Sequence, residues 1–109
     1  NMNFQVELTS EVSDFILSLP VKFQAKIQRT INLLCEFGYS LPEPHSKKIK
    51  SAHKIYELRI KLGSDICRLF YFHWKGTIYV VTSGYIKKTD KLDKREIEKA
   101  EKIKLLFED

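Results

Sequence analysis

Two arginines, two lysines and a tyrosine stand on strand-like runs where they could act together on a phosphodiester. They are Arg59, Arg68, Tyr85, Lys87 and Lys88. Arginine forks contact two phosphate oxygens and stabilise the charge that grows as phosphorus becomes five-coordinate, and lysine and tyrosine can move protons. RNA cleavage by an internal 2′-hydroxyl needs groups of this kind and no metal. If the last three strands pair as consecutive hairpins, these five candidate catalytic residues line one concave face.

Five further lysines accompany this set and are the candidate RNA-binding residues. They are Lys47, Lys48, Lys50, Lys54 and Lys61. Residues 47–95 hold thirteen Lys or Arg against four acids, a local net charge of +9, while the whole chain carries +5. This concentration indicates a surface for a polyanion. The first four lysines can equally be a solvated strand edge that resists edge-to-edge aggregation.

Four of the five candidate catalytic residues also have a structural alternative. Arg68 lies on an apolar side of its strand, where an unpaired charge would be costly, so it can be the ion-pair partner of Glu57 on the neighbouring strand. Tyr85 can simply pack, and Lys87 and Lys88 can be loop charge. The residue types alone leave both interpretations open.

The three histidines show no spacing that would pair two of them, although His53 or His73 stays open as a general acid or base. The sequence has no HxxxH, HExxH or Cys/His ligand cluster, no glycine-rich phosphate loop and no nucleophile elbow. It therefore predicts neither a metal nor another cofactor. Cys35 and Cys67 lack CxxC spacing and are predicted to be reduced, largely buried thiols.

Periodicity predicts the elements that position these residues, in the order strand, helix, helix, three strands, helix. Alternation over residues 4–8 gives a first strand, and helical spacing gives a short helix before Pro20 and a longer one that Gly38 ends. The later strands are expected at 55–62, 66–74 and 77–85. The second of these three is apolar on both faces and belongs in the middle of the sheet. The helical hairpin should cover one face of the sheet, and the face with Arg59 should stay wet and basic.

The length of 109 residues with 43% hydrophobic content predicts a single domain over residues 1–109. Its class is α+β, an antiparallel-rich sheet packed by a helical hairpin and by a C-terminal helix that an Asp93/Glu96 capping box begins. No apolar run approaches the ~20 residues that span a bilayer, and no basic-then-apolar signal pattern is present, so we expect a cytoplasmic protein.

Four motifs in order and spacing resemble the RelE superfamily of bacterial toxins, in its HigB-like, phage-derived branch. They are IYELRI, CRLFYF, GYIKKT and REIEKAEKI, within residues 53–104. The branch typically has W/Y-E-L-R, then Y-R with hydrophobic residues, then G-F-x-K-K-T, then E-I-x-x-A. This chain departs from it in having Cys67 for the common Tyr, Tyr85 for the common Phe, and no proline between Thr89 and Arg95.

The resemblance implies a RelE-like fold and a ribosome-dependent mRNA endonuclease, or mRNA interferase, that inhibits translation. Arg59 and Arg68 would hold and neutralise the scissile phosphate, and Lys87 and Lys88 match the basic residues that end the last strand. The motif supplies no role for the hydroxyl of Tyr85. The implied partners are the ribosome, mRNA and a cognate helix-turn-helix antitoxin that masks the basic face.

Two other functions fit the same residues. One is a ParE-like inhibitor of gyrase, which does not cut RNA. The other is a catalytically inert basic module that binds ribosomal RNA or an antitoxin. Paired lysines at 87 and 88 favour cleavage over gyrase inhibition.

Overall fold

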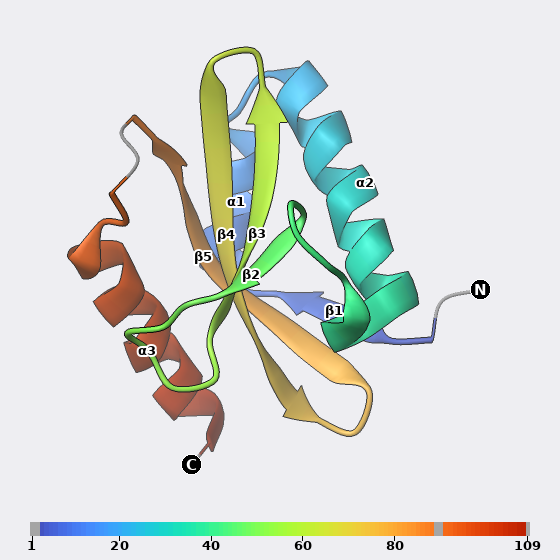
Figure 1. The fold of residues 1–109 in the computed structure, drawn as a ribbon, viewed down its shortest axis with the longest axis vertical. Helices are drawn as coiled ribbons and strands as arrows, with labels where there is room; N and C mark the ends of the chain where they lie inside the picture. The colour runs from blue at the N-terminus through green and yellow to red at the C-terminus, as the bar shows by residue number, and fades with distance from the viewer. Residues whose placement is uncertain (1–2, 89–90, 109) are drawn as a thin grey trace.

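The protein folds around a five-stranded mixed sheet (Figure 1). The computed structural model describes residues 3–88 and 91–108. The elements in chain order are β1 (Gln5–Leu8), α1 (Ser10–Leu17), α2 (Val21–Phe37), the 3-10 helix η1 (Gly38–Ser40), β2 (Ser46–Lys48), β3 (Tyr56–Leu62), β4 (Asp65–Lys75), β5 (Ile78–Lys87) and α3 (Lys94–Glu108). The strand order is β1-β5-β4-β3-β2, with β1 parallel to β5 and every other pair antiparallel. The predicted α+β class and antiparallel-rich sheet are confirmed.

The structure adds one strand to the predicted order of elements. The three-residue strand β2 was not predicted, because its Ser-Lys-Lys sequence carries no apolar alternation. Thr89 and Asp90, which end the GYIKKT motif and enter the local charge count, lie outside the described residues. Within the described ranges, no helix is both long and apolar enough to cross a membrane.

The helices α1 and α2 form the predicted hairpin over one face of the sheet. The N-cap of α1 is Thr9, whose side-chain oxygen accepts a hydrogen bond from the Val12 N–H at 3.1 Å. The helix α2 starts directly after Pro20 and ends at Gly38, whose φ of 58° suits a residue without a Cβ. A first hydrophobic core lies between this hairpin and the sheet. Its fully buried side chains include Val12, Ile27, Leu34, Leu58, Leu69 and Tyr71.

The strand β4 is the middle strand of the sheet, as its apolar sequence predicted. Six consecutive residues, from Cys67 to Phe72, are buried, so this strand must be covered on both sides. The hydroxyl of Tyr71 is hydrogen-bonded to that of Ser46 on β2 at 2.5 Å. Burial raises the pKa of the Tyr71 phenol to about 12 and that of the Cys67 thiol to about 12, so both groups stay protonated at neutral pH.

The other face of the sheet carries a second core, and the expectation that this face stays wet is wrong there. The helix α3 and the segment 49–55 cover it, and their buried side chains pack on Phe70 of β4. This core consists of Ile49, Ala52, Ile55, Phe70, Ile97 and Ala100. Asp93 caps α3 by accepting the Arg95 N–H at 2.9 Å. The expectation of a wet face fails here because the ring of Phe70 lies on this face and is fully buried, so it needs an apolar cover.

Gly84 on β5 allows α1 to approach the sheet, and its replacement tests that packing. A Cβ at this position would lie 2.4 Å from Leu69 Cδ2, 2.9 Å from the Arg68 carbonyl oxygen and 3.0 Å from the Phe15 ring. We expect Gly84→Ala to lower the free energy of unfolding by about 1–3 kcal/mol through overpacking. Urea unfolding followed by circular dichroism measures it, with Ser64→Ala in the exposed β3–β4 turn as the control. A Gly84→Ala protein as stable as the control would contradict this packing.

Candidate nucleic-acid interface

Strand register brings the predicted arginines and tyrosine into one row across the sheet. Arg59 on β3 is directly opposite Arg68 on β4, and Arg68 is directly opposite Tyr85 on β5. Directly opposite residues of paired strands point to the same face. The convergence that the sequence predicted for Arg59, Arg68 and Tyr85 is therefore present.

The neighbouring rows add two lysines and a glutamate to the same face. Lys47 on β2 is opposite Glu57 on β3, and Lys87 on β5 is opposite Ile66 on β4. Because Glu57 and Arg59 are two residues apart on one strand, they share a face. This face is the one that α3 and the segment 49–55 cover in part.

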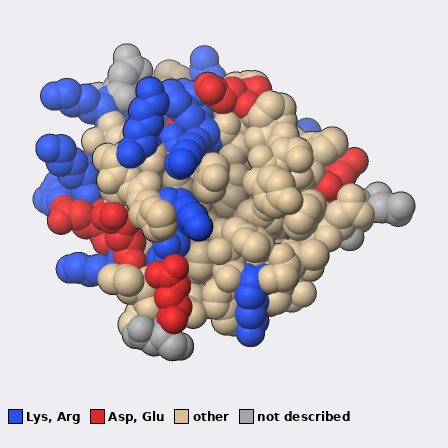
Figure 2. Space-filling view, turned by 60° about the horizontal axis from the view of Figure 1, so that its bottom comes forward, with Lys and Arg blue, Asp and Glu red and all other residues tan. Residues whose placement is uncertain are grey.

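A cavity of about 460 Å³ opens on this face, and we refer to it as the basic cavity. It is lined by Lys47, Lys48, Ile49, Lys50, Ser51, Glu57, Arg59, Arg68, Lys87 and Leu92. Six basic side chains against a single carboxylate give this lining a formal net charge of +5. Figure 2 shows Lys and Arg side chains gathered on one side of the molecular face in view, whereas the other side carries few charges. Such a concave, one-signed surface focuses the electrostatic field on an anion.

Glu57 holds the two arginines of the row in place. It is buried, with 2% of its side chain exposed, and its Oε2 accepts a hydrogen bond from Nη1 of Arg68. Its other oxygen, Oε1, lies 3.8 Å from Nε of Arg59. Two guanidinium groups on directly opposite residues would repel each other, and the carboxylate between them offsets that repulsion.

The two arginines differ in what they offer a ligand. The side chain of Arg59 is 31% exposed, whereas that of Arg68 is only 6% exposed and lies deep in the cavity wall. Within the described part of the chain, the Nε–H of Arg68 is a buried donor with no hydrogen-bond partner. A buried unsatisfied donor costs about 1–3 kcal/mol, so an anionic oxygen that reached it would bind favourably.

Tyr85 belongs to the row without lining the basic cavity. Its ring stacks on Phe70 with centroids 6.0 Å apart, and its hydroxyl oxygen accepts the Asp93 N–H at 3.1 Å. Burial raises its pKa above the ordinary value, and this effect outweighs the opposing hydrogen bond and the nearby charge of Arg68. The phenol therefore keeps its proton at neutral pH, and it links β5 to the start of α3.

The remaining predicted lysines lie outside the basic cavity. Lys88 is 79% exposed and its ammonium lies 4.0 Å from the Asp65 carboxylate. Lys54 is exposed and has a positive φ of 54° in the segment that precedes β3. Lys61 lines a second cavity on the edge of β3. The structure therefore gathers Lys47, Lys48, Lys50, Arg59, Arg68 and Lys87, six of the ten predicted residues.

The histidines left open as proton-transfer groups do not line the basic cavity. His53 is exposed, and it lines a shallow pocket beside α3. His73 is exposed near the β4–β5 turn, where its Nε2 lies 2.6 Å from the Gly76 carbonyl oxygen. Neither residue lines the basic cavity.

Glu57 was not predicted as a site residue, and neither was the cavity wall formed by Ile49 and Ser51. The signal for Glu57 was present, since an acid alternates with Arg59 on the polar side of a strand. The wall depends on the turn between β2 and β3, where the Ile49 N–H donates to the Ile55 carbonyl oxygen at 2.9 Å. The apolar residues Ile49 and Ile55 that fix this turn are its sequence signal.

The fold and this cavity define a small α+β protein with a basic groove on its sheet. Residues 14–104 match the family described as Phage derived protein Gp49-like (DUF891), and the chain belongs to this family. No curated protein sequence matches the chain. Among solved structures, it is similar to a chain in the crystal structure of the archaeal RelE-RelB complex from Pyrococcus horikoshii OT3. The TM-score is 0.54 at 18% identity, and the match covers 76% of this chain and 93% of that chain.

The family match confirms that the sequence motifs are those of a phage-derived protein family. The family match covers the four motifs together with most of the helical hairpin. The similarity to the archaeal chain, at 18% identity, shows a RelE-like fold.

The Glu57–Arg68 pair is testable by a double-mutant cycle on the free energy of unfolding. We expect Glu57→Gln alone to cost about 3–5 kcal/mol, because it leaves the buried Arg68 charge uncompensated. The double variant Glu57→Gln/Arg68→Met should lose less than the sum of the single losses, by a coupling energy above about 0.5 kcal/mol. The matched cycle is Asp65→Asn with Lys88→Met, an exposed pair that should show additive, small effects. Additivity at Glu57 and Arg68 would contradict the proposed interaction.

Proposed function

We propose that this protein is the toxin of a type II toxin–antitoxin system and that it cleaves translated mRNA on the ribosome. The observation that carries the proposal is the basic cavity, in which Glu57 holds Arg59 and Arg68 side by side and the Arg68 Nε–H lacks a partner within the described residues. The membership of the Gp49-like family and the RelE-like fold support it.

The proposed reaction uses the RNA's own 2′-hydroxyl. The 2′ oxygen passes its proton to solvent water and bonds to phosphorus, while the bond from phosphorus to the 5′ oxygen breaks and that oxygen takes a proton from a protein donor or from water. Negative charge grows on the non-bridging oxygens as this occurs, and Arg59, Arg68 and Lys87 are the donors that stabilise it. No step needs a metal or another cofactor.

The remaining residues have supporting roles in this proposal. Lys47, Lys48 and Lys50 attract and align the RNA backbone, and their contribution should weaken with salt. Lys87 lines the basic cavity and is the first candidate for protonating the 5′ oxygen, and Tyr85 and Lys88, which lie outside the cavity lining, are the other two candidates. Glu57 is a positioning residue, since its 2% exposed carboxylate is engaged with Arg68 and lies beside Arg59.

The proposed partner is an antitoxin with an acidic surface that covers the basic cavity. The RelE-like chain from Pyrococcus horikoshii is in a complex with RelB, which is the reason for expecting a partner protein here. The sequence resemblance suggests a helix-turn-helix antitoxin. A negatively charged partner surface would complement the +5 lining of the cavity. The protein would act in the cytoplasm, where ribosomes translate.

Induced expression followed by mapping of mRNA ends tests the proposal. The wild type should arrest growth and produce new 5′ ends inside translated codons, and these ends should disappear when the start codon of the mapped mRNA is removed. Arg59→Ala should reduce cleavage by about 10²-fold, because it removes a donor to the developing charge. Arg29→Ala, an exposed arginine on α2, is the matched control and should cleave normally.

Three results would separate the alternatives. Growth arrest with intact mRNA and loss of DNA supercoiling would replace the proposal with gyrase inhibition. Growth arrest with intact mRNA and salt-sensitive ribosome binding would leave a binding module without catalysis. Equal loss of cleavage in Arg59→Ala and Arg29→Ala would show that the basic cavity is not the site of cleavage.

A further inference from the structure

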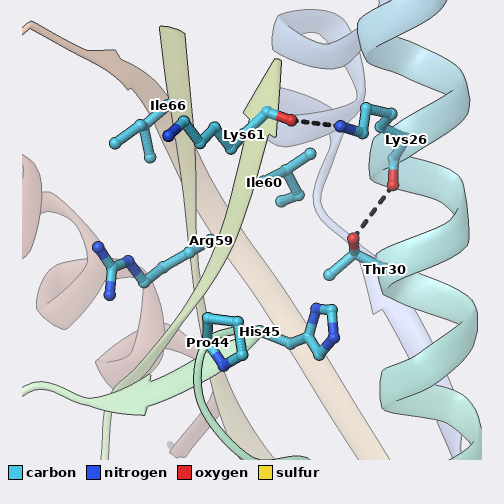
Figure 3. Close-up of a pocket in the computed structure, with 8 residues that line it drawn as sticks. All are labelled: Lys26, Thr30, Pro44, His45, Arg59, Ile60, Lys61 and Ile66. Atoms are coloured by element: carbon cyan, nitrogen blue, oxygen red, sulfur yellow. Dashed lines mark hydrogen bonds between the residues drawn. The ribbon is translucent and has the colours of Figure 1, made fainter. Parts of the chain in front are cut away.

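A second cavity, of about 340 Å³, lies on the edge of β3 beside the basic cavity, and we refer to it as the edge cavity. It is lined by Lys26, Thr30, Pro44, His45, Arg59, Ile60, Lys61 and Ile66, none of which is acidic. Figure 3 shows Arg59 and Lys61 extending to one side of β3, with Lys26, Thr30 and His45 on the other side, toward α2. Arg59 lines both cavities, so the edge cavity continues the basic cavity over the edge of the sheet.

The edge of β3 is open at this point because β2 pairs only with Tyr56–Leu58. The Arg59 N–H donates to the carbonyl oxygen of His45 at 2.9 Å, and His45 is the last residue of the loop before β2. Backbone groups of alternate strand residues point to the same side, so the Lys61 N–H points into the edge cavity. The Lys61 carbonyl oxygen accepts a hydrogen bond from the Lys26 ammonium at 2.6 Å.

The lining of the edge cavity favours a flat, partly apolar ligand that offers hydrogen-bond acceptors. Pro44, Ile60 and Ile66 supply apolar surface, and the imidazole of His45 is an aromatic platform. Its volume lies in the range of about 300–1,000 Å³ that is usual for small-ligand sites. An added peptide strand fits less well, because Lys26 already occupies the carbonyl that such a strand would need.

We propose that the edge cavity is a nucleobase subsite that takes the base of the nucleotide whose phosphate lies at Arg59. This inference rests on the proposed function, since it adds a base-reading site to the proposed RNA-binding face. The ring of His45 stacks on the base, and the Lys61 N–H with the Lys26 ammonium donates to acceptors on the base edge. Among the residues that the structure describes, His45 forms hydrogen bonds through its backbone alone, with Pro42 and Arg59, so its side chain is available for this contact.

A nucleotide titration tests the subsite without requiring cleavage. The ¹⁵N-labelled full chain is titrated with inorganic phosphate and with each of the four nucleoside 5′-monophosphates. Phosphate should shift only signals from the basic cavity, whereas at least one nucleotide should also shift the Lys61 amide and the His45 imidazole. His45→Ala should weaken that nucleotide's binding about fivefold or more, the lower range for base–aromatic stacking. Identical Lys61 and His45 shifts with phosphate alone, or unchanged binding by His45→Ala, would overturn the proposal.

The base preference of cleavage gives a second test. His45→Ala should still cleave mRNA but lose about fivefold of its preference for one base beside the cut. His45→Phe, which keeps an aromatic ring, should retain that preference, and His53→Ala should behave as the wild type. The subsite is overturned, and the endonuclease function stands, if His45→Ala keeps the wild-type base preference. The same holds if His45→Phe loses that preference as His45→Ala is expected to. A wild type that cleaves nothing refutes the endonuclease function, and the titration then decides the subsite.

Discussion

The buried contact between Glu57 and Arg68 is the interaction on which the rest of the site depends. A charged side chain with 6% exposure is tolerated in the middle of a sheet only if it is paired, and Glu57 is the partner. The same carboxylate allows Arg59 to stand directly opposite Arg68. A protein that needed only stability would place apolar side chains here, since replacing a buried ion pair by packed apolar residues is often neutral or stabilising. Retaining charges at this position is consistent with a function that needs two adjacent guanidinium groups.

The two cores fix this pair from opposite sides. The helical hairpin packs on one face of β3 and β4, while α3 and the segment 49–55 pack on the other around Phe70. The second core covers only part of its face, and the basic cavity is the part left open. Tyr85 connects the two regions, because it packs on Phe70 and accepts a hydrogen bond from the residue that caps α3. The position of α3 and the shape of the cavity are therefore coupled.

Strand patterns predicted the position of the arginine row, because hairpins with short turns leave few choices of register for Arg59, Arg68 and Tyr85. The pairing of Arg68 with Glu57 was open from the sequence, and the structure shows it. The sequence predicted a C-terminal helix packed on the sheet, but not that this helix would cover Phe70 on the face that carries the arginines, because that depends on how a distant helix packs. The partner of the Tyr85 hydroxyl was not predictable either, since it is a backbone group beyond the end of β5. Residues on regular strands were thus predictable, and contacts from loops and from α3 were not.

The role of the oriented Arg68 guanidinium is tested most directly by the cleavage of mRNA on purified ribosomes under single-turnover conditions, measured beside binding to the same ribosomes. The comparison is between the wild type and Arg68→Lys, which keeps the charge but loses the planar fork that Glu57 orients. We expect the cleavage rate at saturating protein to fall by about 10²–10³-fold while ribosome binding is nearly unchanged. An Arg68→Lys protein that cleaves at the wild-type rate once bound would contradict it.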